Sequence, residues 1–235
     1  MSTPANDLSS TPSTLALFDL DHTLLDVDSD YLWGEYIVKH GLVDEAEYRT
    51  ANQDFYDQYI AGTLDATEYN EFVAQFLTTL PLARLHDLRE DYVKYEIEPH
   101  MRPKAITVLK EHLELGHDVV IISATNDFVV SAIAERFGIE DANVLATPLE
   151  IKNERYTGQL ADKPNFKDGK IYHLNKWLAK QKAAGISFDK TYAYSDSKND
   201  LPLLQWADVP VCVSPDDALH AHALAHRWAV EDWSI

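Results

Sequence analysis

Apolar and polar positions follow two rhythms along the chain. In 14–27, and again from about residue 100, short apolar runs typical of buried strands alternate with helical patterns. Between 28 and 99 the apolar residues recur at helical spacing, and no segment there predicts a strand. Alternating strands and helices favour a mostly parallel sheet covered by helices. We therefore expect an α/β, Rossmann-like core domain made of 14–27 and 100–235, with a helical domain at 28–99 inserted after the first strand.

The core domain has predicted elements at regular intervals. Strands are expected at 15–18, 118–122, 191–194 and 210–213, and helices at 105–115, 127–137, 171–184 and 200–205. Residues 144–160 favour a strand pair, with turn chemistry at Thr157-Gly158.

The inserted block predicts about four helices. Aromatic residues recur at helical spacing from Tyr48 to Ile60, and Tyr69 begins a second apolar stripe that continues to Leu77. Periodic apolar residues are normally buried, so we expect these aromatic stripes to form the core of a helical bundle and not to line a ligand site.

Charge limits the classes of partner. The 235 residues carry 20 Lys and Arg against 39 Asp and Glu, a formal charge of −19. This balance disfavours nucleic acid and anionic membranes as partners, although a bound metal ion lets a small anion approach. Residues 1–13, rich in Ser, Thr and Pro, predict a disordered tail and not a signal peptide. No apolar run is long enough to span a bilayer, so we expect a cytoplasmic protein, of undetermined oligomeric state.

The most informative feature is the pair Asp19 and Asp21, which directly follows the first apolar run. Side chains alternate faces along a strand, so two carboxylates one residue apart point the same way and repel each other. Either a cation or a retained proton relieves this repulsion.

Three further polar features follow other predicted strands or begin a helix. They are the segment Ser123-Ala124-Thr125, the lysine Lys170, and the acids Asp196 and Asp200. The carboxyl ends of parallel strands meet at one edge of a sheet. Phosphoryl transfer needs a carboxylate nucleophile, a hydroxyl and N–H cradle, a fixed cation and oxygen ligands for Mg²⁺, and this edge would supply each of them.

These four features, in this order and with a helical insert after the first, resemble the motifs of the haloacid dehalogenase (HAD) superfamily. The insert is similar to a type C1 cap, and the segment from Ser195 to Asp200 resembles subfamily IB, which includes phosphoserine phosphatases. The resemblance implies a HAD-type phosphatase that uses Mg²⁺ and an aspartyl-phosphate intermediate to hydrolyse a small phosphorylated metabolite.

The resemblance also implies residue roles. Asp19 would be the nucleophile and Asp21 the general acid and base, with Lys170 stabilising charge on the phosphate. Asp19, Asp21 through its carbonyl, Asp196 and Asp200 would form the metal site. The expected phosphate contacts are Ser123, Ala124, Thr125 and Asn199.

Four positions depart from the family pattern or compete for a role. Ser195 stands where glycine often precedes the fourth-motif acid, and His22 where many relatives have Gly or Ser. Lys163 and Lys167 compete with Lys170, which we favour because it follows Gly169 and begins a helix.

Substrate recognition is expected in the insert. In phosphoserine phosphatases an acid after the first motif contacts the substrate amine, and an arginine contacts its carboxylate. Asp28 occupies about the first position and Glu71 the second, which favours an amino-alcohol phosphate such as histidinol phosphate over phosphoserine. The alternative is that Asp28 only caps a helix and Glu71 is solvated.

Other functions stay open at this stage. They are a phosphoserine phosphatase, a phosphotransferase, and a non-catalytic phosphate-binding regulatory protein that kept the fold. A phospho-acceptor receiver domain also carries paired aspartates, but it is about half as long and has no insert. His220, His222 and His226 are interpreted as a solvated helix face and not as a metal site.

Overall fold

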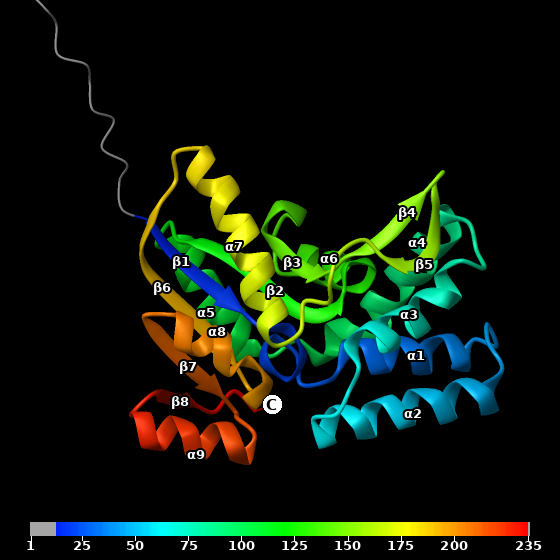
Figure 1. The fold of residues 1–235 in the computed structure, drawn as a ribbon, viewed down its shortest axis with the longest axis horizontal. Coiled ribbons are helices and arrows are strands. Elements are labelled where there is room, and N and C mark those ends of the chain that lie inside the picture. The colour runs from blue at the N-terminus through cyan, green and yellow to red at the C-terminus, as the bar shows by residue number, and fades with distance from the viewer. Residues whose placement is uncertain (1–12, 235) are drawn as a thin grey trace, which may run out of the picture.

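The computed structural model describes residues 13–234, so the predicted tail lies outside the described residues except for Ser13, which begins the first strand. A six-stranded sheet, in which every pairing is parallel, has the order β3-β2-β1-β6-β7-β8 (Figure 1). Its strands are β1 (Ser13–Phe18), β2 (Asp118–Asn126), β3 (Val144–Thr147), β6 (Phe188–Ser195), β7 (Val209–Val213) and β8 (Ala229–Glu231). The expected α/β class is thus confirmed.

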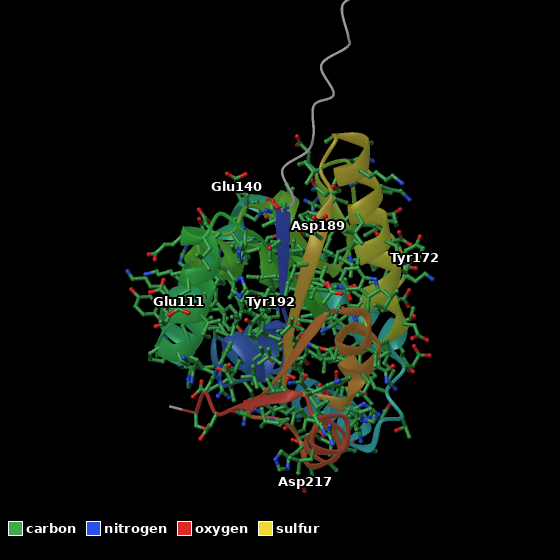
Figure 2. The ribbon with its side chains drawn as sticks, turned by 90° about the vertical axis from the view of Figure 1, so that its left-hand side faces the viewer. Glu111, Glu140, Tyr172, Asp189, Tyr192 and Asp217 are labelled. Carbon is green, nitrogen blue, oxygen red and sulfur yellow. The ribbon has the colours of Figure 1, made fainter. Side chains whose placement is uncertain are left out.

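Alternation along the strands produces two hydrophobic layers. Leu15 and Leu17 of β1 belong to one cluster, and Ala16 and Phe18 to the other. The first cluster is covered by α7 (Asp168–Ala183), α8 (Leu201–Trp206) and α9 (Asp217–His226). The second is covered by α5 (Pro103–Glu114) and α6 (Asp127–Arg136). Figure 2 shows α5, which carries Glu111, and α7, which carries Tyr172, on opposite sides of the sheet.

The segment after β1 is helical, as the spacing predicts. It contains α1 (Ser29–Lys39), α2 (Glu45–Ala61), α3 (Ala66–Leu77) and α4 (Leu82–Tyr92), followed by the short turns η2 (Val93–Ile97) and η3 (Glu98–His100). Aspartates begin the first three helices, because the side chains of Asp28, Asp44 and Asp65 accept hydrogen bonds from main-chain N–H groups of the first turn. Trp33 of α1 contacts the rings of Tyr92 and Phe128, so this segment shares a hydrophobic cluster with the sheet.

The strand pair predicted at 144–160 is only partly correct. The first of these segments, β3, joins the main sheet beside β2. An antiparallel hairpin is formed instead by β4 (Leu149–Lys152) and β5 (Arg155–Leu160), and its turn is at Asn153 and Glu154, which both have positive φ. The turn expected at Thr157-Gly158 is therefore wrong, because both residues lie within β5.

The fold brings the ends of β1, β2 and β6 to one edge of the sheet, beside helices α1 to α3 (Figure 1). Helix α9 carries the three histidines of the C-terminal region. Within 13–234 none of the helices is both long and apolar enough to cross a bilayer.

Candidate active site

Asp19 is fixed immediately after β1. Its N–H donates to the Tyr194 carbonyl oxygen, and its Oδ1 accepts from Lys170 Nζ at 2.7 Å. Lys170 Nζ also donates to Asp200 Oδ2 at 2.7 Å. All three side chains are buried, so two carboxylates from different strands share one lysine at the edge of the sheet.

Burial and neighbouring charges together set the pKa values of Asp19 and Lys170. Desolvation raises the pKa of Asp19 to about 7, and the charges of Asp200 and Asp21 add to the effect, while Lys170 opposes it. Burial acts to lower the pKa of Lys170, but Asp19 and Asp200 outweigh it and hold that pKa above its usual value. The lysine therefore stays positively charged, and its charge does not fully offset the effect of burial on the pKa of Asp19.

Thr23 links Asp19 to the second acid of the site. Its hydroxyl lies 3.2 Å from Asp19 Oδ2 and 3.1 Å from Asp196 Oδ1, and it accepts from the N–H of Asp196. Burial, together with the charges of Asp19 and Asp200, raises the pKa of Asp196 well above its usual range. Thr23 was not among the candidate site residues predicted from the sequence, because a threonine four positions after Asp19 carries no signal of its own.

These oxygen donors fit a magnesium ion. Mg²⁺ prefers carboxylate and carbonyl oxygens and keeps several waters, and a divalent cation would relieve the crowding of Asp19 and Asp196. No three His, Cys, Asp or Glu side chains within 13–234 are grouped so that they could hold a metal by themselves.

The side chain of Asp21 turns toward α1 and the end of β2. Its Oδ1 accepts from the Ser29 N–H at 2.7 Å, and its Oδ2 accepts from Thr125 Oγ1 at 2.8 Å and from Ser123 Oγ at 3.4 Å. The following residue, His22, has φ of 55°, a left-handed conformation that glycine adopts more easily. The side chains of Asp19 and Asp21 point in different directions because β1 ends at Phe18 and a helical turn begins at Leu20, so the strand alternation expected for this pair does not apply.

The remaining motif residues divide between the pocket wall and its support. Ala124, Thr125 and Asn199 line the pocket. Ser123 is fully buried behind them, where its Oγ accepts from the Thr125 N–H. Ser195 is also buried, and its Oγ donates to Asp200 Oδ2 at 2.7 Å.

The two competing lysines lie away from Asp19. Lys163 Nζ lies 3.9 Å from the centre of the Tyr172 ring, and Lys167 Nζ approaches the Gly62 carbonyl oxygen.

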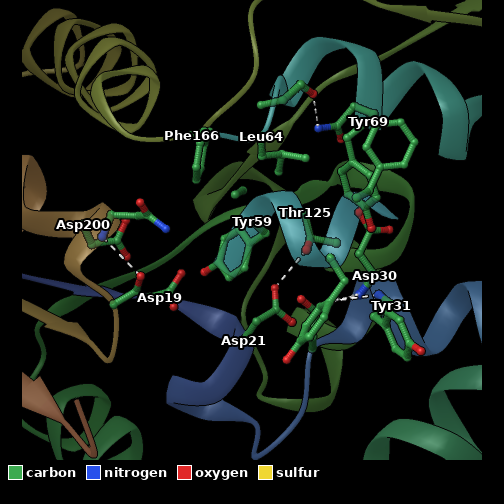
Figure 3. A pocket seen from close by; sticks show the side chains of 18 of the residues that line it. Asp19, Asp21, Asp30, Tyr31, Tyr59, Leu64, Tyr69, Thr125, Phe166 and Asp200 are labelled. Carbon is green, nitrogen blue, oxygen red and sulfur yellow. Dashed lines mark hydrogen bonds between the residues drawn. The ribbon is translucent and has the colours of Figure 1, made fainter. Parts of the chain in front are cut away.

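One pocket extends from the Asp19–Lys170–Asp200 triad to helices α1, α2 and α3. In Figure 3, Asp19 and Asp200 lie at one end, Asp30, Tyr31 and Tyr69 at the other, and Tyr59 and Phe166 between them. Lys170 is the sole Lys or Arg among the described residues that line it. Its aromatic and acidic wall consists of Tyr31, Phe55, Tyr56, Tyr59, Tyr69, Phe166, Asp28 and Asp30.

Asp28 has two functions that the sequence could not separate. Its Oδ1 caps α1 by accepting from the N–H groups of Asp30 and Tyr31, and its side chain also lines the pocket. Burial, followed by the charge of Asp21, raises the pKa of Asp28 to about 6.

Two expectations about the insert need correction. Glu71 does not line the pocket, whereas its neighbour Asn70 does, because successive helical residues point about 100° apart. Several aromatic residues assigned to a bundle core, including Phe55, Tyr59 and Tyr69, line the pocket instead. Their spacing shows only that they share a helix face, and that face is turned toward the site.

Comparisons with known proteins agree with the motifs. Residues 16–205 match the model of the haloacid dehalogenase-like hydrolase family. The chain belongs to this family. The expected family and fold class are confirmed, and so is the expected enzyme class, a HAD-type phosphatase.

Individual relatives cover nearly the whole of this HAD chain. It is 40% identical over 217 residues to "Histidinol-phosphatase" of Neisseria meningitidis, an alignment that covers 92% of this chain and 97% of the relative. A protein of unknown function from Bordetella pertussis has a TM-score of 0.88 at 37% identity, with 95% of this chain and all of the other covered. A substrate-bound phosphoserine phosphatase has a TM-score of 0.62 at 19% identity, over 96% and 95% of the two chains, and this shows a shared fold.

Proposed function

We propose that the protein is a Mg²⁺-dependent phosphomonoesterase that forms an acyl phosphate, an aspartyl-phosphate, on Asp19. Asp19 attacks phosphorus, the ester P–O bond breaks, and Asp21 gives its proton to the leaving oxygen. Asp21 then takes a proton from water, which attacks phosphorus and releases Asp19. The support is geometric, since Asp19 is held by Lys170 in the pocket and Asp21 lies two residues further along the same wall.

Asp19, Asp196 and the carbonyl of Asp21 would hold the metal, and Asp200 would act beside it. When bound, the ion would neutralise carboxylate charge and clamp phosphate oxygens. The residues themselves orient the reaction: Lys170 fixes Asp19 Oδ1, while Thr125 and Asn199 face the volume that the phosphate would occupy.

The substrate we propose is an amino-alcohol phosphate, with histidinol phosphate as the specific candidate. The observation that carries this is the pocket wall. Asp28 offers a carboxylate to an amine there, and among the described lining residues Lys170 is the one Lys or Arg that could meet a substrate carboxylate. Phosphoserine would place its carboxylate against Asp28 and Asp30. The Neisseria relative named for histidinol phosphate supports the same choice.

A panel of phosphate esters tests the proposal. Wild-type protein, with Mg²⁺ and with a chelator, is assayed for phosphate release from histidinol phosphate, phosphoserine, phosphoethanolamine and glycerol phosphate. We expect the highest kcat/KM for histidinol phosphate, and no release after chelation. Faster turnover of phosphoserine than of histidinol phosphate would refute the substrate assignment.

A variant distinguishes catalysis from binding alone. Asp19→Asn keeps the shape of the side chain but removes the nucleophile, so phosphate release should fall by roughly a thousandfold or more while the melting curve stays cooperative. Unchanged release in Asp19→Asn would end the mechanism, and absent release in wild type would favour a non-catalytic phosphate-binding protein. Transfer of phosphate to added alcohols, measured in the same assays, would indicate a phosphotransferase.

A further inference from the structure

Asn70 presents an unpaired oxygen inside the site. The residue lies on α3, lines the pocket and is 2% exposed. Its Nδ2 donates to the Ala66 carbonyl oxygen at 2.8 Å, whereas its Oδ1 has no hydrogen-bond partner among the described residues. The amide cannot be turned over to exchange the two atoms, because a carbonyl needs a donor. Buried amide oxygens nearly always accept a hydrogen bond. For this oxygen the donor must therefore come from a molecule in the pocket, a ligand or a water.

The position of Asn70 separates it from the phosphate end. It follows Tyr69, which Figure 3 places opposite Asp19 and Asp200 across the pocket. The electrostatic neighbours agree with this placement. Besides burial, the charges of Asp30 and Asp28 raise the pKa of Tyr69, whereas those of Asp196 and Asp19 have the larger effects on the pKa of Tyr59. Asn70 therefore faces the part of a substrate that is remote from phosphorus.

The surroundings of Asn70 suit a flat group with an N–H donor. Phe55, Tyr56 and Tyr69 supply aromatic surface, on which a planar ring packs well. Burial raises the pKa of Asp30 well above its usual range. The amide oxygen of Asn70 is a neutral acceptor, unlike the carboxylate of Asp28.

We propose that Asn70 Oδ1 accepts a hydrogen bond from a ring N–H of the substrate, which selects phosphate esters of amino alcohols that carry a nitrogen heterocycle. This rests on the proposed function and extends it by dividing recognition between two residues. Asp28 takes the ammonium group, and Asn70 takes the neutral ring donor. In histidinol phosphate that donor is the single N–H of the uncharged imidazole.

The test pairs a protein change with a substrate change. Wild type and Asn70→Leu, which keeps the side-chain shape but has no acceptor, are assayed at pH 8 on histidinol phosphate and on its ring-N-methylated analogues, which have no ring N–H. We expect wild type to lose about tenfold in kcat/KM on methylation, the worth of one hydrogen bond, and Asn70→Leu to be about tenfold weaker on histidinol phosphate yet nearly indifferent to methylation.

Two controls separate folding from recognition. Phosphoethanolamine has the amine but no ring, so Asn70→Leu should hydrolyse it at the wild-type rate. Glu68→Gln, an exposed change on the same helix, should match wild type on every substrate. If Asn70→Leu fails to fold, the wild-type protein still tests the proposal, because an undiminished rate on either methylated isomer would overturn it.

The outcomes are distinct. Equal losses on methylation in wild type and Asn70→Leu would show a purely steric effect and overturn the role of Asn70 while leaving the proposed function standing. In wild type alone, an undiminished rate on either methylated isomer would also overturn it. A wild type that hydrolyses phosphoethanolamine or phosphoserine better than histidinol phosphate would overturn the substrate and the role of Asn70 together.

Discussion

At the scale of single residues, Ser195 explains how this chain tolerates a departure from the family pattern. Its hydroxyl donates to Asp200 Oδ2 at 2.7 Å and accepts from the Ser197 N–H at 3.3 Å. Glycine at this place could do neither. The serine thus fixes Asp200, the acid that shares Lys170 with Asp19.

Removing that hydroxyl should affect both stability and turnover. Ser195→Ala leaves Asp200 Oδ2 with Lys170 alone, and we expect a loss of about 1–3 kcal/mol in the free energy of unfolding, together with a roughly tenfold fall in kcat. Urea denaturation and steady-state kinetics measure the two effects. Wild-type values for both would show that the hydroxyl is dispensable.

Asp28 predicts a pH dependence that only amine substrates show. Because its pKa is raised to about 6 by burial and by the charge of Asp21, the carboxylate is lost as pH falls through 6. The kcat/KM for an amine-bearing phosphate, divided by that for glycerol phosphate, should therefore rise toward pH 6 and level off above it. The ratio removes the titration of the phosphate group, which both substrates share.

The matched variant for Asp28 separates its two functions. Asparagine caps helices as well as aspartate, so Asp28→Asn should unfold at no lower urea concentration at pH 7, yet its substrate ratio should be low and independent of pH. The folded protein is destabilised when an acid whose pKa is raised by folding becomes ionised. A neutral amide at the same position does not carry this cost. A ratio that still rises through pH 6 in Asp28→Asn would assign the titration elsewhere.

Single residues also mark the limit of sequence reasoning. Asp19, Asp21, Lys170, Asp196 and Asp200 were predictable as candidates, because each belongs to a motif beside a strand end or helix start. Asn70 was missed in favour of Glu71, since the choice depends on the rotation of α3 about its axis. That rotation is set by tertiary packing and not by local spacing.

At the scale of elements, the β4–β5 hairpin is packed against α3, which carries Asn70. Gly158 of β5 has φ of +81°, and its carbonyl oxygen accepts from Gln75 Nε2 at 3.3 Å. A Cβ at this position would lie 2.7 Å from Gln75 Nε2 and 3.2 Å from Thr78 Cγ2. A side chain at this position would therefore push the Gln75 amide out of its place between hairpin and helix.

Gly158→Ala should loosen that contact. The left-handed backbone costs an alanine about 1–2 kcal/mol, and displacing the Gln75 amide from its hydrogen bond to the Gly158 carbonyl about 0.5–1.5 kcal/mol more. Gly185→Ala is the matched control, because Gly185 has φ of +84° and an added methyl group there would meet nothing within 4 Å. Equal losses in the free energy of unfolding for the two variants would argue against tight packing of the hairpin on α3.

The hairpin also shows why the sequence predicted its turn at the wrong residues. Glycine at Thr157-Gly158 suggested a turn, because positive φ is easiest for glycine. Here Asn153 and Glu154 adopt positive φ in the turn, while Gly158 uses its own positive φ inside a strand beside α3. The requirement at Gly158 comes from Gln75, which lies 83 positions earlier in the chain, and no local pattern reveals it.

At the scale of the whole molecule, the sequence predicted the amount of negative charge but not its distribution. Of the formal charge of −19, five aspartates converge on one pocket, which holds a single lysine: they are Asp19, Asp21, Asp28, Asp30 and Asp200. Parallel strand order explains the convergence of three of them, and α1 brings the other two. The field at the pocket mouth is therefore unfavourable to an approaching phosphate.

This field predicts an unusual response to salt. With Mg²⁺ held saturating, raising KCl from about 10 mM to 150 mM shortens the screening length from about 30 Å to about 8 Å and weakens repulsion of the phosphate. We expect kcat/KM to rise severalfold while kcat stays level, because screening acts on encounter and not on the enclosed site. Glycerol phosphate, which has no ammonium group to offset its charge, should show the steeper rise, and histidinol phosphate the shallower. A fall in kcat/KM with salt for both esters, reproduced with a second monovalent salt, would mean that the bound cation dominates the field and that the aspartates act only at contact distance.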